Sequence, residues 1–192
     1  AVDFLKKHGK TAIVWNESLN SGMMPNDIIV QRWMDKKDRS VEFANKGGKM
    51  IVSEFYYYYC DYPYGMTSLK KTYSLDPYIK GLTEAGKKNV YGVECPIWAE
   101  YVRDFDKLSY MCFPRFWAVA EAGWTKRANM DYNSFEERFE ALRPMLEEMG
   151  IKPAPRSDWN PNFLQSLKEL KQFFKGTTNL DNILNMIRNN QA

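Results

Sequence analysis

Histidine, cysteine and net charge are all scarce in this 192-residue sequence. It contains one histidine and three cysteines, Cys60, Cys95 and Cys112, with no CxxC pair. The small number and the spacing of these residues argue against a structural zinc site and against a disulfide scaffold. We therefore expect the cysteines to be small buried hydrophobes. A net charge of +3 with scattered lysines and arginines is far from the basic footprint of a nucleic-acid-binding protein. We therefore predict no metal, no cofactor and no nucleic-acid partner.

Long apolar runs are also missing. No stretch approaches the ~20 consecutive apolar residues of a transmembrane helix, so we expect no membrane partner. No signal-peptide pattern is present, but the sequence starts abruptly inside a predicted helix, Ala1–His8, which Gly9 would end. The localisation therefore stays open.

Aromatic residues, in contrast, are abundant. They make up 15% of the sequence and include six tryptophans, and several of them close short apolar runs. Near-continuous valine and isoleucine without polar alternation is typical of buried parallel strands. The four runs of this kind are Thr11–Glu17, Asp27–Trp33, Lys49–Asp61 and Tyr91–Glu100.

Helices are predicted between and after these runs. Val41–Lys46 is a short crossover helix before Gly47, and Asp61–Pro77 is a long loop that would face a substrate. Asn133–Met149 is an amphipathic helix that Pro144 should kink or divide. The other expected helices are Asp76–Lys88, Pro114–Gly123, Phe163–Lys175 and Leu180–Arg188.

The number of predicted strands indicates the fold. A complete eight-stranded β/α barrel needs about 250 residues, whereas this sequence shows about four parallel strands with crossover helices. We predict an α/β fold that is the C-terminal half of a (β/α)8 TIM barrel plus extra C-terminal helices. Residues 1–150 would form the half-barrel, and residues 151–192 would form a linker and a C-terminal helical extension.

Aromatic and acidic residues gather at the predicted strand ends, where barrels carry their chemistry. Tyr59-x-Asp61 and Trp98-x-Glu100 repeat one spacing, which directs both side chains of a pair to the same side of an extended strand. Flat rings beside carboxylates suit a sugar, because its C–H faces stack on the rings and its hydroxyls need acceptors. The candidate residues are Trp15, Glu17, Trp33, Tyr59, Asp61, Trp98 and Glu100.

In this order, the sequence motifs resemble the C-terminal half of the catalytic barrel of glycoside hydrolase family 20, the β-N-acetylhexosaminidases. The resemblance begins at His8-Gly9-Lys10 and fades near Gly150. Between these points the matching motifs are Trp15-Asn16-Glu17, Val30-Gln31-Arg32-Trp33, Tyr59-Cys60-Asp61, Ile97-Trp98-Ala99-Glu100 and Pro114-Arg115 with Glu121 and Trp124.

The resemblance implies a pocket for a terminal N-acetylhexosamine at the end of a glycan. Trp15, Trp33 and Trp98 would line this pocket, and Asp61 and Glu100 would accept hydrogen bonds from sugar hydroxyls. The implied activity is exo-hydrolysis of terminal β-linked GlcNAc or GalNAc. The resemblance assigns no functional role to Glu17. A structural role near the barrel rim is an equal alternative to a functional one for this residue.

The implied mechanism is substrate-assisted retention, in which the 2-acetamido oxygen attacks the anomeric carbon. Tyr59 would position that oxygen as a catalytic residue. The family's catalytic Asp-Glu pair has no match in this sequence, so the general acid is absent from this chain. We therefore expect the chain to be inactive alone and to need the missing N-terminal half of the barrel as a partner.

Two alternatives belong to other functional classes. The chain could be a non-catalytic carbohydrate-binding module that uses the same aromatic platforms. It could also be a structural half-barrel that self-associates, because open sheet edges favour pairing with another chain. A monomer in size-exclusion chromatography would count against self-association. The sequence does not separate GlcNAc from GalNAc.

Overall fold

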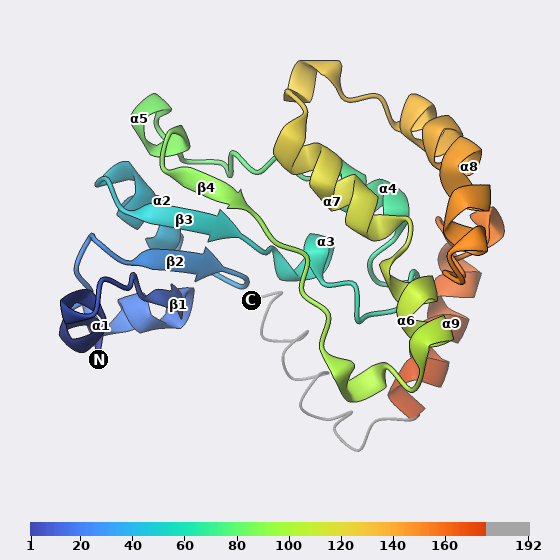
Figure 1. Ribbon diagram of the computed structural model, residues 1–192, viewed down its shortest axis with the longest axis horizontal. Coiled ribbons are helices and arrows are strands. Elements are labelled where there is room, and N and C mark those ends of the chain that lie inside the picture. Colours follow the sequence, from blue (N-terminus) through green and yellow to red (C-terminus); the bar gives the residue numbers. More distant parts are fainter. Residues whose placement is uncertain (176–192) are drawn as a thin grey trace.

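Four parallel strands form one sheet in the computed structural model of this protein, which describes residues 1–175 (Figure 1). The strands lie in their sequence order, and each is hydrogen-bonded to the next in a parallel register. This sequential parallel order is that of a β/α barrel, so the predicted four-stranded α/β architecture is confirmed. The strands are β1 (Ile13–Trp15), β2 (Ile29–Arg32), β3 (Lys49–Val52) and β4 (Val90–Val93).

The third and fourth strands end earlier than the sequence predicts. β3 ends at Val52, and the helix α3 (Phe55–Tyr58) follows, with the Tyr58 N–H donating to the Glu54 carbonyl at 2.8 Å. β4 ends at Val93, before Pro96, which has no N–H to donate to a strand ladder. The two aromatic-x-acid pairs therefore lie in segments beyond the strands, and their expected placement on extended strands is wrong.

The crossover helices lie along the sheet in Figure 1. Helix α2 (Arg39–Asn45) confirms the predicted crossover between β2 and β3, and its Phe43 and Ala44 are buried against the sheet. Asn45 connects α2 to the next crossover, because its Nδ2 donates to the Gly81 carbonyl at 3.0 Å. Of the weak helix predicted over 76–88, only α5 (Glu84–Lys87) forms. At the N-terminus, α1 (Val2–Lys7) is helical as expected.

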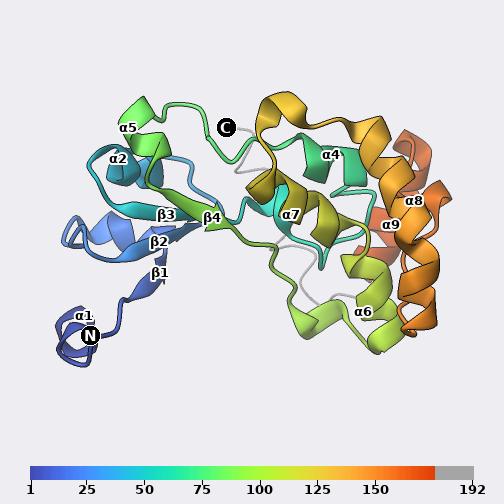
Figure 2. The same cartoon turned by 45° about the horizontal axis from the view of Figure 1, so that its top comes forward.

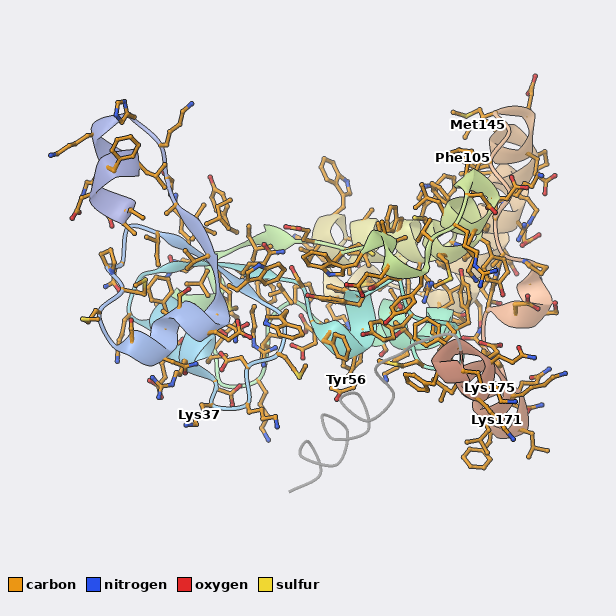
Figure 3. All side chains as sticks on the ribbon, turned by 90° about the horizontal axis from the view of Figure 1, so that it is seen from below. Lys37, Tyr56, Phe105, Met145, Lys171 and Lys175 are labelled. Atoms are coloured by element: carbon orange, nitrogen blue, oxygen red, sulfur yellow. The ribbon has the colours of Figure 1, made fainter. Side chains whose placement is uncertain are left out.

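A second group of helices lies beyond the end of the sheet (Figure 2). Helix α7 (Arg115–Trp124) connects the two parts, because its Val119 packs in the cluster with the sheet residues and its Ala118 packs in the helical cluster. In Figure 3, Lys37 is labelled in the half of the molecule that holds the sheet and Met145 in the half that holds these helices. The helices of this group are α4 (Leu69–Ser74), α6 (Phe105–Cys112), α7 (Arg115–Trp124), α8 (Tyr132–Glu148) and α9 (Phe163–Lys175).

The sequence predicts some of these helices and misses others. Helices α7, α8 and α9 were expected, and α8 runs through Pro144 without being divided. Helix α4 lies inside the predicted loop, where the Ser68 side chain caps it. Helix α6 was missed, although Asp104 is a capping signal whose side chain accepts the Lys107 N–H at 2.7 Å. The predicted helix 180–188 lies outside the described residues.

The proline-rich segment 151–161 packs on the helical group. Trp159 is fully buried with its ring 5.5 Å from that of Phe139, and its Nε1 donates to the Ala154 carbonyl at 2.9 Å. Its own carbonyl accepts the Leu69 N–H at 2.8 Å. This segment therefore closes the helical core, while the division at residue 150 stays a prediction. Among residues 1–175, no helix combines the length and apolar character needed to cross a membrane.

Replacing Trp159 should reveal how much this segment stabilises the chain. We expect Trp159→Ala to lower the free energy of unfolding by about 3–5 kcal/mol, because removal of a large buried ring leaves a cavity. Urea denaturation followed by circular dichroism measures this loss. The matched control is Trp124→Ala, since Trp124 is 93% exposed, and its effect should stay within about 0.5 kcal/mol. Equal effects of both variants would contradict the packing role of residues 151–161.

Candidate functional site

A cavity of about 590 Å³ opens at the carboxyl ends of the strands. The structure brings all seven candidate residues of the sequence analysis to this one cavity, although they come from four separate segments of the chain. It also brings two residues that the sequence analysis did not select, Phe55 and Tyr62. The lining residues are Trp15, Glu17, Trp33, Phe55, Tyr59, Asp61, Tyr62, Trp98 and Glu100.

Three indole rings and a phenol form the aromatic wall. The Trp15 ring centroid lies 6.3 Å from that of Trp33, with the planes nearly perpendicular, and 6.3 Å from that of Trp98. Tyr59 continues the wall with its ring centroid 6.0 Å from that of Trp33. Trp98 remains 48% exposed, which leaves an open aromatic face at the mouth. Such rings offer a ligand apolar surface of defined geometry.

Trp33 is held by the two residues that follow Trp15. Asn16 and Glu17 begin the short 3-10 helix η1 (Asn16–Ser21). The Asn16 Oδ1 accepts the Trp33 backbone N–H at 3.0 Å, and its Nδ2 donates to the Met34 carbonyl at 3.2 Å. Glu17 Oε1 accepts the Trp33 indole N–H at 2.5 Å. Glu17 therefore positions an indole of the wall, which gives this residue a structural partner at the rim.

Asp61 places a buried carboxylate in the cavity wall. The residue is 2% exposed, and its Oδ1 has no hydrogen-bond partner within the described chain. Burial raises the pKa of Asp61 to about 6, with the charge of Arg115 opposing the rise and that of Glu100 adding to it. A buried acceptor without a donor is energetically costly, so Asp61 is ready to accept a hydrogen bond from a ligand hydroxyl.

Arg115 fixes the backbone that carries Asp61. Its guanidinium is completely buried, and it lies 4.2 Å from the centroid of the Tyr64 ring. Its Nη2 donates to the Cys60 carbonyl at 2.6 Å, and its Nη1 donates to the carbonyls of Tyr62 and Thr67 at 2.8 and 3.1 Å. One side chain thus holds both flanks of Asp61 in place.

Tyr59 is a hydrogen-bond donor at neutral pH. Burial raises the pKa of the Tyr59 phenol most strongly; a hydrogen bond with the Trp98 side chain lowers it, and the negative charges of Asp61 and Glu17 raise it further. The residue is 4% exposed. A phenol in this environment keeps its proton, so it can donate to a carbonyl oxygen placed in the cavity.

Phe55 was missed because its segment was assigned to a strand, and Tyr62 was missed because it lay in the predicted loop 61–77. Phe55 and Tyr59 are four residues apart, a helical spacing that puts them on one face, and their ring centroids lie 5.0 Å apart. The Tyr62 ring centroid also lies close to that of Phe55, at 5.1 Å. A helical period over 55–59 would have found Phe55. Across residues 1–175, no three histidine, cysteine, aspartate or glutamate side chains gather as metal ligands do.

A sequential parallel sheet with its pocket at the carboxyl ends of the strands defines the class, a segment of a (β/α)8 barrel. Residues 1–127 match the model of the glycosyl hydrolase family 20 catalytic domain. The chain belongs to glycoside hydrolase family 20, and the resemblance of its motifs to this family is confirmed.

Curated relatives of this chain are named beta-hexosaminidase or beta-N-acetylhexosaminidase. The chain is 33% identical over 155 residues to a beta-hexosaminidase of Akkermansia muciniphila. The aligned region covers 74% of this chain and 31% of that protein. It is 27% identical to a beta-N-acetylhexosaminidase of Cellulomonas fimi, over 83% of this chain and 35% of that protein. The chain thus spans about a third of the length of these relatives.

Solved structures agree with the fold. A mutant Streptomyces plicatus beta-hexosaminidase in complex with its product GlcNAc is 31% identical, with a TM-score of 0.70 over 83% of this chain and 36% of that one. The exo beta-N-acetylglucosaminidase of Vibrio harveyi, at 23% identity, aligns with a TM-score of 0.74 over 81% of this chain and 26% of that one. The α/β half-barrel fold predicted for this chain is therefore confirmed.

Replacing Asp61 should stabilise the chain in a pH-dependent way. Its folded-state pKa of about 6 lies above the ordinary 3.8, so between these values the folded chain holds a proton that the unfolded chain has released. Stability therefore falls as pH rises through this window. We expect Asp61→Asn to raise the free energy of unfolding at pH 7 by roughly 1–3 kcal/mol and to lose that advantage near pH 4.

Urea denaturation at the two pH values measures the difference. The control is Asp3→Asn, because Asp3 is exposed and its replacement should change stability by less than about 0.5 kcal/mol. An advantage of Asp61→Asn that is equal at both pH values would contradict the role of the buried charge.

Proposed function

We propose that this chain forms the sugar pocket of an exo-β-N-acetylhexosaminidase, an enzyme that hydrolyses terminal β-linked GlcNAc or GalNAc. One observation carries the proposal: an aromatic wall of three indoles and Tyr59 encloses a buried carboxylate, Asp61, whose Oδ1 lacks a donor. Membership of family 20 supports it, as does the GlcNAc product bound in the Streptomyces plicatus structure.

Each part of the cavity matches one part of an N-acetylhexosamine. The indoles offer faces for the C–H surface of the ring and for the acetamido methyl group. Asp61 and Glu100 offer acceptors for the hydroxyls at the non-reducing end. The Tyr59 hydroxyl, which keeps its proton, donates to the acetamido carbonyl oxygen. A sugar without the acetamido group leaves this donor unpaired in a buried site, which is unfavourable.

The proposed reaction uses the substrate as its own nucleophile. The acetamido oxygen attacks the anomeric carbon as the glycosidic bond breaks, and water then opens the oxazolinium intermediate with net retention. Tyr59 holds and polarises the attacking oxygen, which is a positioning contribution. No Asp-Glu pair follows a strand in this sequence, so the proton for the leaving group would come from the other half of the barrel.

Binding of an intermediate analogue tests the pocket directly. We expect N-acetylglucosamine thiazoline, which mimics the cyclised intermediate, to bind the chain in isothermal titration, while glucose does not bind. Trp98→Ala should weaken binding roughly tenfold, because stacking on an aromatic ring contributes on the order of 1 kcal/mol. Trp124→Ala, which removes an exposed ring outside the cavity, is the matched control. Absence of binding, or equal binding of glucose, would contradict a preformed acetamido pocket.

Tyr59→Phe tests the role of the hydroxyl in catalysis. The chain is co-expressed with an upstream family-20 segment that carries an Asp-Glu pair, and hydrolysis of a chromogenic N-acetylglucosaminide is measured. We expect the variant to lower kcat on the order of 100-fold, as for removal of one donor to a developing charge, with a smaller change in KM. Tyr78→Phe, at a tyrosine outside the cavity, should leave both unchanged. An unchanged kcat in Tyr59→Phe would remove Tyr59 from the mechanism.

A further inference from the structure

Two cysteines face each other directly behind the cavity. Cys60 lies between Tyr59 and Asp61 in the segment after β3, and Cys95 lies in the segment after β4 that leads to Trp98. Their Sγ atoms are 2.9 Å apart, and both residues are free thiols. A contact between two sulfur atoms thus joins the two segments that carry the acidic side of the pocket.

The backbone holds these two sulfur atoms together. The Cys60 N–H donates to the Pro96 carbonyl at 3.0 Å, and the Cys95 thiol lies 3.0 Å from the Tyr58 carbonyl, to which it donates. These two hydrogen bonds cross between the segments on either side of the sulfur pair. The approach of the thiols therefore follows from the register of the backbone and not from the rotation of one free side chain.

The surroundings favour a thiolate at Cys60. Arg115 donates to the Cys60 carbonyl at 2.6 Å and brings a buried positive charge next to the sulfur atoms. Although burial opposes it, the hydrogen bond with Cys95 and the charge of Arg115 lower the pKa of the Cys60 thiol. Cationic neighbours of this kind are typical of reactive cysteines. Cys95 is only half-buried, which gives a small oxidant access to the pair.

We propose that Cys60 and Cys95 form a reversible disulfide that ties the segment after β3 to the segment after β4. The Cys95 thiol passes its proton to the Cys60 thiolate as it attacks one sulfur of a low-molecular-weight disulfide such as glutathione disulfide, and one glutathione leaves as a thiolate. That thiolate takes the proton from Cys60, whose sulfur then displaces the second glutathione from Cys95. Two protein thiols are oxidised and one small disulfide is reduced to two thiols. Because a disulfide bond is about 2.05 Å long, the sulfur atoms need to approach by only about 0.9 Å.

The bond would change the pocket without touching a ligand. Oxidation would fix Tyr59 and Asp61 relative to Trp98 by a covalent bond, and reduction would leave them joined by hydrogen bonds alone. The formation of the bond can be measured whether or not the chain binds a sugar, so its failure is distinct from a failure of the proposed function.

Mass spectrometry of the unsubstituted chain tests the pairing. The chain is equilibrated in buffers of oxidised and reduced glutathione, free thiols are blocked with N-ethylmaleimide, and the digest is analysed without reduction. We expect one cross-linked peptide pair that joins Cys60 to Cys95, with Cys112 alkylated, and its loss in excess reduced glutathione.

The same oxidation in 8 M urea, a concentration on the order of those that unfold small domains, is the control for the fold. In an unfolded chain the shorter loop between Cys95 and Cys112 closes more easily, so the pairing should shift toward Cys112. Alkylation of Cys60 and Cys95 at every glutathione ratio would overturn the proposal. The same mixture of pairs with and without urea would overturn it as well.

Hydrogen exchange tests the effect on the pocket. Oxidised and reduced chain are compared, and we expect slower exchange in residues 54–61 and 94–101 after oxidation. Cys112→Ser should keep both the cross-link and the slowing, whereas Cys95→Ser should lose both. Because the main comparison uses the unsubstituted chain, it holds even if a variant does not fold. Unchanged exchange on oxidation would overturn the tying role of the bond.

Discussion

A single buried guanidinium, that of Arg115, holds the functional face of this half-barrel in place. Removing a charge from water is costly unless its donors are satisfied, and here the donors bind backbone carbonyls of the 60–67 segment and of Met111. The segment contains Asp61 and Tyr62 and leads into the helical group. The shape of the pocket therefore depends on a side chain that lies in a helix behind it and does not line it.

The site is built at a cost to stability. Asp61 is buried with an unsatisfied oxygen, Arg115 carries a buried charge, and Trp98 exposes almost half of its surface. None of these arrangements would be selected for folding alone, and such compromises concentrate at functional sites. Under the proposed function, a bound sugar would satisfy the oxygen of Asp61 and cover Trp98, so the ligand would recover free energy that the empty pocket lacks.

The sheet and the helices have different structural roles. The four strands aim their carboxyl ends at the cavity, and α7 couples the sheet to the helical group through residues on its two sides. β1 and β4 are the edges of the described sheet. In a complete barrel such edges pair with further strands and closure removes them, which agrees with a chain that spans about a third of its family-20 relatives.

The sequence by itself determined the parallel strands and most of the pocket. Buried parallel strands leave near-continuous apolar runs, and the motifs at their ends have a family resemblance, so Trp15, Trp33 and Asp61 could be selected by reading alone. Helix α3 was not predicted, because four consecutive tyrosines suit a strand as well as a helix and packing decides between them, so the helical spacing that would have found Phe55 was not preferred.

Only the tertiary structure decided which distant side chains meet. The indole of Trp33 is held by Glu17, Asp61 is framed by Arg115, and Cys60 faces Cys95. No local pattern records these pairs, because each joins segments that are far apart in the chain. They become neighbours when the strands align in register and the carboxyl ends of parallel strands meet at one edge.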